Sequence, residues 1–284
     1  MSTGSQLEVV CKWAEDVNMK FNSDKFECLR FCPAGTTKPN CGYNGPDGAD
    51  IEEKPHLRDL GVELSSDLSF KVHIQNVVTS ATQLSGWALR TFRRRSRGVM
   101  ITIWKCLVQP KIDYCSQLWS PDNQADITQL ENVQRHFTSR ISGMEGKNYW
   151  ERLQELKLSS QERRRERYQV IFIWKLSQNL IKGYNLEFKS DNRRGRLAIE
   201  KSSNQRCPTS VRNARLSSLA VKGVRIFNMM PKELRDINSS KVETFKAGLD
   251  EYLSKVPDQP TIPDSGRAAS SNSLLHQLPL LRTI

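Results

Sequence analysis

Apolar and polar positions divide this chain into a short mixed front and a longer helical body. In the front, a helix is predicted over residues 6–18, and short strands are predicted over 26–31 and 60–64. Residues 33–50 are rich in glycine and proline, which is typical of turns. The helix prediction rests on apolar residues that share one face: Leu7, Val10, Trp13, Ala14 and Val17.

Beyond residue 70 the apolar spacing becomes helical. One stripe, with steps of three and four residues, consists of Phe70, Ile74, Val77, Ala81, Leu84 and Ala88. Pro110 should kink or break the second helix, and Ser159 and Ser160 are both candidate N-caps of a later one. The further helices are predicted over residues 99–118, 126–141, 148–156, 159–182, 218–229 and 239–254.

These patterns predict a mostly α protein with a small α/β part at the N-terminus. We divide it into an N-terminal segment (1–70), a helical domain (71–185), a basic linker (186–217), C-terminal helices (218–256) and a disordered tail (257–284). The linker is poor in apolar residues, and the tail is rich in proline and serine, so both should be loosely ordered. The C-terminal region is therefore expected to be partly disordered and basic.

The charge of the chain is uneven. The net charge is +12, but residues 1–70 carry seven Lys or Arg against twelve Asp or Glu, a balance of −5. The remaining residues therefore carry +17. An acidic front and a strongly basic body favour a polyanionic partner, most simply nucleic acid, over a basic surface kept for solubility.

Basic residues are densest between 90 and 97, where five of eight residues are arginine. Arginine can bridge phosphate oxygens with two hydrogen bonds, and Phe92 could stack on a base. The alternative is a solvated surface, in part complementary to the C-terminal end of a helix dipole. The candidate nucleic-acid-binding residues here are Arg90, Phe92, Arg93, Arg94, Arg95 and Arg97.

Two further basic segments are less distinctive. On the helix predicted over 159–182, ion pairing with Glu162 and Glu166 competes with nucleic-acid contact as an interpretation. Residues 189–225 carry ten Lys or Arg against two Asp or Glu and could form a flexible polyanion-binding arm. The candidate contacts on the helix are Arg163, Arg164, Arg165 and Arg167.

No pattern indicates an enzyme site in this chain. It contains no adjacent aspartates, no phosphate-binding loop and no serine nucleophile elbow. Cys28, Cys32 and Cys41 with His56 match no common zinc module, so reduced thiols are the favoured interpretation. Four tryptophans on helical apolar faces are expected in the core rather than at a ligand: Trp87, Trp104, Trp119 and Trp174.

Several segments together resemble, in family order, the reverse transcriptases of non-LTR (LINE-type) retrotransposons. No single one is specific, but together they extend over roughly residues 6–260. The clearest are Trp13-x5-Met19-Lys20-Phe21-Asn22-x2-Lys25, Asp59-Leu60-Gly61-Val62, Leu107-Val108-x-Pro110-x3-Tyr114-x4-Trp119-Ser120-Pro121, Asp126-Ile127-x2-Leu130-Glu131, Tyr149-x2-Arg152-Leu153, Arg225-x-Phe227-Asn228 and Phe245-Lys246-x2-Leu249.

The resemblance implies that residues 1–70 are a palm remnant with a primer-grip-like region and that 71–185 is a helical, thumb-like bundle. Asn22 and Lys25 would belong to a palm motif, and Leu60 and Gly61 to the primer grip. A complete member copies RNA into DNA and would need Mg²⁺ at its aspartates. This chain is expected to hold no metal or cofactor and to have no catalytic residue of its own.

The favoured hypothesis is a truncated reverse transcriptase that retains at most sequence-independent binding to RNA, DNA or their hybrid. One alternative is that the chain is part of an active RNA-directed DNA polymerase and associates with the missing polymerase portion. Another is a co-opted protein-interaction module, in which helix 70–92 faces a partner. No segment predicts a membrane span, and we expect an intracellular protein, nuclear or cytoplasmic.

Overall fold

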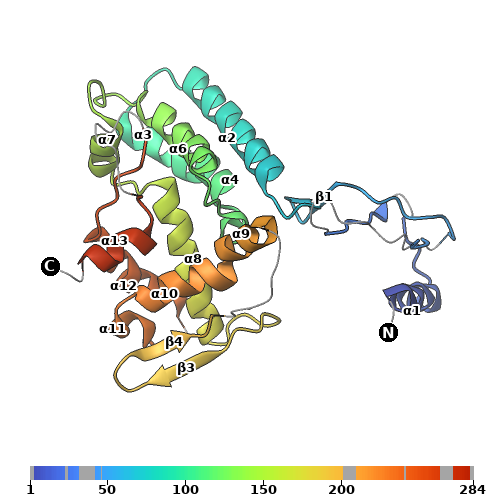
Figure 1. Cartoon of the computed structure of the whole chain (residues 1–284). Coiled ribbons are helices and arrows are strands. Elements are labelled where there is room, and N and C mark those ends of the chain that lie inside the picture. The colour runs from blue at the N-terminus through green and yellow to red at the C-terminus, as the bar shows by residue number, and fades with distance from the viewer. Residues whose placement is uncertain are drawn as a thin grey trace. The chain divides into compact units, whose positions relative to one another are not determined.

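The computed structural model describes residues 3–22, 25–31, 42–45, 47–200, 209–239, 241–262 and 271–281. It divides into two compact units, one formed by residues 1–73 with 208–211 and the other by 74–207 with 212–284 (Figure 1). In chain order, the elements are α1 (Thr3–Asp16), β1 (His56–Asp59), β2 (Val62–Ser65), α2 (Lys71–Thr91), α3 (Arg97–Ile103), the π-helical turn η2 (Trp104–Val108), α4 (Gln109–Asp113), α5 (Ser116–Trp119), α6 (Gln124–Thr138), α7 (Tyr149–Leu156), α8 (Gln161–Ser177), β3 (Phe188–Asp191), β4 (Gly195–Ala198), α9 (Thr209–Ser217), the π-helical turn η3 (Leu219–Gly223), α10 (Val224–Met229), α11 (Lys232–Arg235), α12 (Val242–Ser254) and α13 (Leu274–Leu281). The prediction of a mostly α chain with a small α/β part is confirmed.

The first unit contains α1 and the antiparallel hairpin β1–β2. The hairpin pairs Asp59 with Val62, so Leu60 and Gly61 form its two-residue turn, both with positive φ. This is the backbone geometry that matches the twist of a tight hairpin. The predicted strand at 60–64 therefore begins two residues later. The strand predicted over 26–31 is wrong, because the backbone there forms no strand and has one isolated β-bridge, from Cys28 to Glu53.

In the second unit, the second predicted helix changes its form before Pro110. Since proline lacks an N–H, the chain changes from α3 to the π-helical turn η2 just before it, and α4 begins with Pro110 in its first turn. The backbone stays helical through Pro110 to Asp113, then leaves the helical conformation at Tyr114, and Cys115 is left-handed, so α5 starts in a new direction. The helix was predicted to kink or break at Pro110; its break lies later, at Tyr114 and Cys115.

Helix α8 lies at the centre of the second unit, where α5, α6, α10 and α12 pack against it (Figure 1). Ser160 is its N-cap, as predicted, and accepts a hydrogen bond from the backbone N–H of Arg163. The helix ends at Ser177 rather than near 182, because Asn179 adopts a left-handed conformation and the N–H of Leu180 bonds back to the carbonyl of Lys175.

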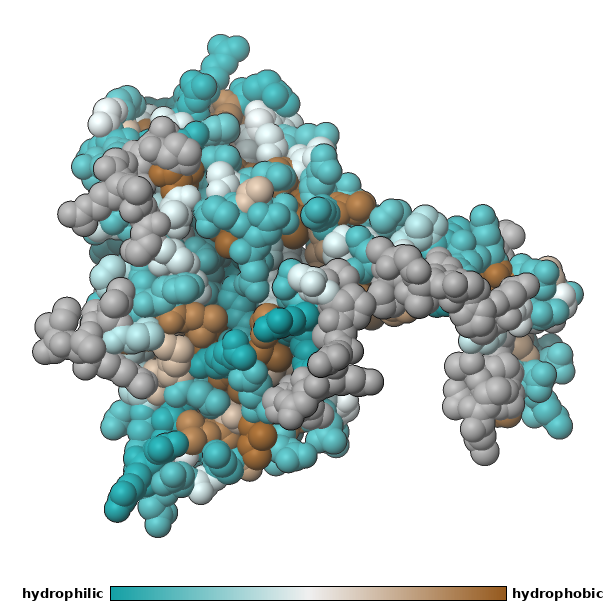
Figure 2. Space-filling view, viewed as in Figure 1, coloured by the Kyte–Doolittle hydropathy of each residue, from teal (hydrophilic) through white to brown (hydrophobic). Residues whose placement is uncertain are grey.

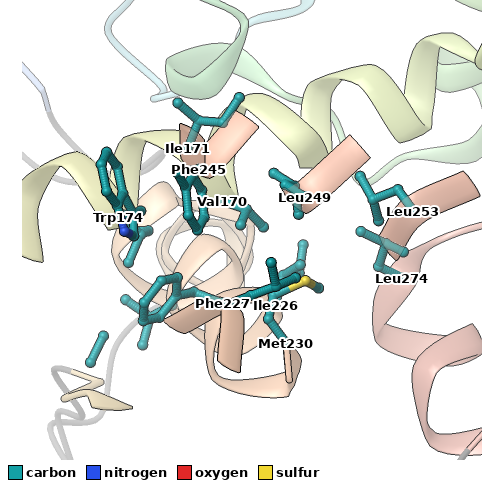
Figure 3. Packing of buried hydrophobic residues seen from close by; sticks show 14 of the residues in the cluster. Val170, Ile171, Trp174, Ile226, Phe227, Met230, Phe245, Leu249, Leu253 and Leu274 are labelled. Carbon is teal, nitrogen blue, oxygen red and sulfur yellow. The ribbon is translucent and has the colours of Figure 1, made fainter. Parts of the chain in front are cut away.

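The main core lies between α8 and the C-terminal helices. Trp174 of α8 stacks on Phe245 of α12 with ring centroids 4.5 Å apart and planes at 6° (Figure 3). Phe227 of α10 and Leu274 of α13 are fully buried in the same cluster. These contacts join residues that lie far apart in the sequence, so this core depends on the C-terminal third of the chain.

The C-terminal third is more ordered than the sequence indicates. Residues 188–198, within the predicted linker, form the hairpin β3–β4. Residues 271–281, within the predicted disordered tail, contain α13, whose Leu274 and Leu278 are buried. The physical reason is that α13 is rich in leucine and adds an apolar face to the main core, a local signal that the proline and serine of the whole segment 257–284 hide. The rest of the predicted domain division stays a prediction.

The visible face of the second unit is mostly hydrophilic, with separate hydrophobic patches (Figure 2). Within the described ranges, no helix combines the length and the apolar character needed to cross a membrane.

Candidate nucleic-acid interface

The densest basic run connects two helices. Helix α2 ends at Thr91, with a last backbone bond from Phe92 N–H to the carbonyl of Ala88, and α3 begins at Arg97. Ser96 is the N-cap of α3 but makes no side-chain cap bond. We call Arg90, Arg93, Arg94, Arg95 and Arg97 together the arginine corner. Because the corner lies on a short connection, its side chains are presented from one small region.

Three of these arginines are exposed and have no binding partner among the described residues. Across the part of the chain that the structure describes, Arg90, Arg93 and Arg94 form neither an ion pair nor a side-chain hydrogen bond. Arg95 is half-buried, and its Nη2 donates to the carbonyl of Leu89 at 3.3 Å. Arg97 lies 3.8 Å from the carboxylate of Glu155. The corner thus holds three solvated cations beside two that have partners.

An exposed aromatic pair lies at the same helix end. The rings of Trp87 and Phe92 meet edge to face, with centroids 6.3 Å apart. Phe92 is half-buried, whereas Trp87 is 46% exposed. The prediction that Trp87 belongs to the core is wrong, although it is confirmed for Trp104, Trp119 and Trp174. The buried stripe of α2 passes through Ala81 and Ala88, and Trp87 lies one residue off it; that offset is the sequence signal that could have revealed it.

A second loop is tied to the corner. The backbone N–H of Ser142 donates to the carbonyl of Arg95 at 2.9 Å. Ile141 and Met144 are buried and anchor this loop between α6 and α7. Arg140 is exposed and Lys147 is half-exposed on the same loop. The fold therefore brings two cations that the sequence analysis did not select to a loop that contacts the corner.

The second predicted arginine group, on α8, does not join the first. Arg163 is 2% exposed, and its Nη2 donates to the carbonyl of Pro257 and to Gln277 Oε1, both at 2.8 Å. Arg165 is 1% exposed and lies near Glu131 and other buried carboxylates. Burial lowers the pKa of Arg165 from its usual value, and the carboxylates oppose that shift.

The outer arginines of α8 form ion pairs. Arg164 Nη2 lies 2.6 Å from Asp113 Oδ2, and Arg167 Nη2 donates to Asp250 Oδ2 at 2.7 Å. The hydrogen bond to Asp250 raises the pKa of Arg167. Of the two interpretations left open for this run, its placement favours packing and ion pairing.

The candidate palm and primer-grip residues lie in the first unit. Asn22 and Lys25 are exposed and are joined by a backbone bond from Lys25 N–H to Asn22 O at 3.1 Å. Leu60 is 84% exposed at the tip of the β1–β2 hairpin, next to Gly61. Their assignment to family motifs stays a prediction.

The basic segment 189–225 is only partly described, because residues 201–208 lie outside the described ranges. Arg225 is paired with Glu200 at 2.7 Å, and the backbone N–H of Arg196 donates to Asp236 at 2.6 Å. These contacts fix parts of the segment to the second unit rather than leaving them as a free arm.

Cys32 and Cys41 of the possible zinc set also lie outside the described residues. Among the residues that are described, no group of three or more His, Cys, Asp or Glu is placed to hold a metal. Cys11, Cys28, Cys106 and Cys115 are free thiols.

Comparison with known proteins points in one direction. The chain is 25% identical over 141 residues, 48% of its length, to the RNA-directed DNA polymerase from mobile element jockey of Drosophila melanogaster. The corresponding protein of Drosophila funebris matches over the same number of residues with the same identity. The chain is distantly related to mobile-element reverse transcriptases. It spans 15% of the length of each of these relatives.

No protein-family model matches the chain. No solved structure matches it either. The relationship to reverse transcriptases therefore rests on these sequence similarities.

Proposed function

We propose that this chain binds nucleic acid without sequence preference through the arginine corner. The observation that carries the proposal is the set of three exposed arginines, Arg90, Arg93 and Arg94, which have no partner among the described residues and share one helix connection. Like charges gathered this closely repel one another unless anions lie between them. Phosphate oxygens of a nucleic-acid backbone supply such anions at regular spacing.

The aromatic pair beside the corner adds a second kind of contact. Trp87 is 46% exposed beside Phe92, so part of the indole surface is open to a base. Stacking on an aromatic ring tolerates every base, because each base has a π-face. Phosphate contact and stacking together give binding that depends little on sequence and favours strands with accessible bases.

The similarity to two RNA-directed DNA polymerases supports this proposal, because enzymes of that name act on nucleic acid. The sequence contains no adjacent aspartates, so the proposed role for this chain is template–primer binding rather than catalysis. Helix α2, which a protein-interaction module would turn toward a partner, instead buries Ala81 and Ala88 within the chain itself.

The test compares two triple variants of equal charge by fluorescence anisotropy with labelled oligo(dT). R90A/R93A/R94A removes the unpaired arginines of the corner, and K111A/K182A/K241A removes three exposed cations elsewhere on the second unit. Because each phosphate contact contributes roughly 0.7 to the slope of log K against log salt on single strands, the corner variant should reduce that slope by about 2. The control variant should change it by less than about half as much.

Two outcomes would overturn the proposal. One is wild-type binding that does not change between low and high salt. The other is equal loss in both triple variants, since that would mean that net charge alone, and not the corner, attracts the oligonucleotide.

A further inference from the structure

Glu155 of α7 lies between two cations at the edge of the arginine corner. Its Oε1 is 3.8 Å from Arg97 Nη1, and its Oε2 contacts Lys147 Nζ. The Lys147 ammonium and the Arg97 guanidinium lower the pKa of Glu155, so this carboxylate is ionised at neutral pH. All three side chains are 36–46% exposed, so solvent and larger anions can reach them.

The fold holds these groups in place from both sides. A capping box between Asn148 and Glu151 fixes the start of α7 directly after Lys147. Arg152 Nη1 donates to the backbone carbonyl of Lys147 at 2.8 Å, which fixes the position of that residue in the loop. The contact of Ser142 with Arg95 connects the loop to the corner. The backbone is thus set, and the Lys147 and Arg97 side chains can exchange partners without a change of fold.

We propose that Lys147 is a further phosphate contact and that Glu155 occupies both Lys147 and Arg97 of the corner until a nucleic acid displaces it. This inference rests on the proposed function and extends the interface from the corner to the loop 140–147. The ligand is the phosphodiester backbone, because only the charge and oxygen geometry of phosphate are recognised here.

The exchange follows from the weakness of exposed ion pairs. A carboxylate in contact with water holds a lysine or arginine loosely, and salt screens the attraction. A nucleic acid already bound at Arg90, Arg93 and Arg94 raises the local concentration of phosphate at the neighbouring cations. Glu155 then acts as an internal competitor that reduces affinity by the free energy needed to release it.

The matched experiment uses E155Q and E145Q with labelled oligo(dT) over a range of salt concentrations. Both variants remove one negative charge near the loop, but exposed Glu145 has no ion pair among the described residues, so E145Q releases no cation. E155Q should bind several-fold more tightly than wild type at low salt, and this advantage should shrink as salt rises, because salt weakens the ion pairs that oppose binding in wild type. E145Q should leave the slope unchanged.

The double variant R97A/K147A, compared with and without E155Q, distinguishes release of the two cations from a general loss of negative charge. If Glu155 acts through Lys147 and Arg97, R97A/K147A/E155Q should bind no more tightly than R97A/K147A. Equal affinity and slope for E155Q and E145Q would overturn the inference while leaving the proposed function intact, provided that R90A/R93A/R94A still loses binding. Absence of wild-type binding would overturn both. Circular dichroism melts of each variant confirm that the fold is retained.

Discussion

The carboxylate of Glu131, on α6, accepts the backbone N–H of Gln161, the first residue of α8, at 2.9 and 3.1 Å. The hydroxyl of Tyr149 on α7 donates to the same carboxylate at 2.5 Å. Glu131 is 1% exposed, so it joins three helices through one buried group at the positive end of a helix dipole.

Glu131→Ala should therefore destabilise the second unit by about 3 kcal/mol, because it leaves the Gln161 N–H and the Tyr149 hydroxyl buried without their acceptor and removes one of the carboxylates near Arg165. Tyr149→Phe removes a single donor and should cost about 1 kcal/mol. Urea denaturation of the two variants and of E145A, a control at an exposed residue, measures how much free energy of unfolding each loses. A loss for Glu131→Ala no larger than that of the control would contradict a joining role.

The free energy of unfolding should depend on pH because of the buried carboxyl group of Glu162. Burial, aided by the neighbouring Glu166 carboxylate, raises the pKa of Glu162 from 4.5 to about 7. Below pH 4.5 both the folded and the unfolded state hold this proton, so its stabilising effect is fully present. As pH rises toward 7 the unfolded state releases the proton first, and stability is lost.

Glu162→Gln should remove this dependence. The free energy of unfolding of wild type relative to Glu162→Gln should fall by of order 3 kcal/mol between pH 4.5 and 7.5, at about 1.4 kcal/mol per unit of pKa. Denaturant titrations at several pH values give the difference, in which carboxylates that do not interact with Glu162 cancel. A constant difference across this range would show that Glu162 titrates normally.

Trp87→Ala should weaken binding to single-stranded oligonucleotides by about tenfold, because one stacked base is worth about 1–3 kcal/mol. Trp13 on α1, 55% exposed, offers a matched control. Trp13→Ala should leave the anisotropy titration unchanged. Equal losses in the two variants would contradict a specific stacking site beside Phe92.

Trp174→Ala should reduce the stability of the fold, whereas Trp87→Ala should mainly reduce nucleic-acid binding. The Trp174 ring is fully buried against Phe245, and its Nε1 donates to the carbonyl of Ile237 at 3.1 Å. Truncation should cost about 3–5 kcal/mol of stability. Thermal melts should show that the exposed Trp87→Ala costs less than about 1 kcal/mol. Similar melting temperatures for the two variants would contradict the assigned core.

Local features of the fold could be predicted from the sequence, because the spacing of apolar residues indicates which face of a helix is buried. The stripe of α2, the irregular helix around Pro110 and the Ser160 cap all depend on neighbours within a few residues. The hairpin β3–β4 was missed because its strands have only four residues each and show no clear alternation of apolar and polar residues.

The sequence alone could not show which of the two arginine groups is exposed. Their sequences look alike, yet Arg93 is exposed while Arg163 is buried by Pro257 and Gln277, more than ninety residues further along the chain. Local composition contains no information about such distant partners. Lys147 was missed for the same reason, since only the fold places its loop beside Arg95.

The contacts at the start of α8 also set an order of events during synthesis. Ser160 N–H donates to Asp258, Arg163 is held by Gln277, and Glu166 accepts the N–H of Leu274. In a nascent chain that extends only to the end of α8, the charged side chains that the complete second unit buries would have no partners. The second unit can therefore close only after residue 277 has left the ribosome, so a slow or stalled translation of the last hundred residues exposes α8 to aggregation or to chaperones.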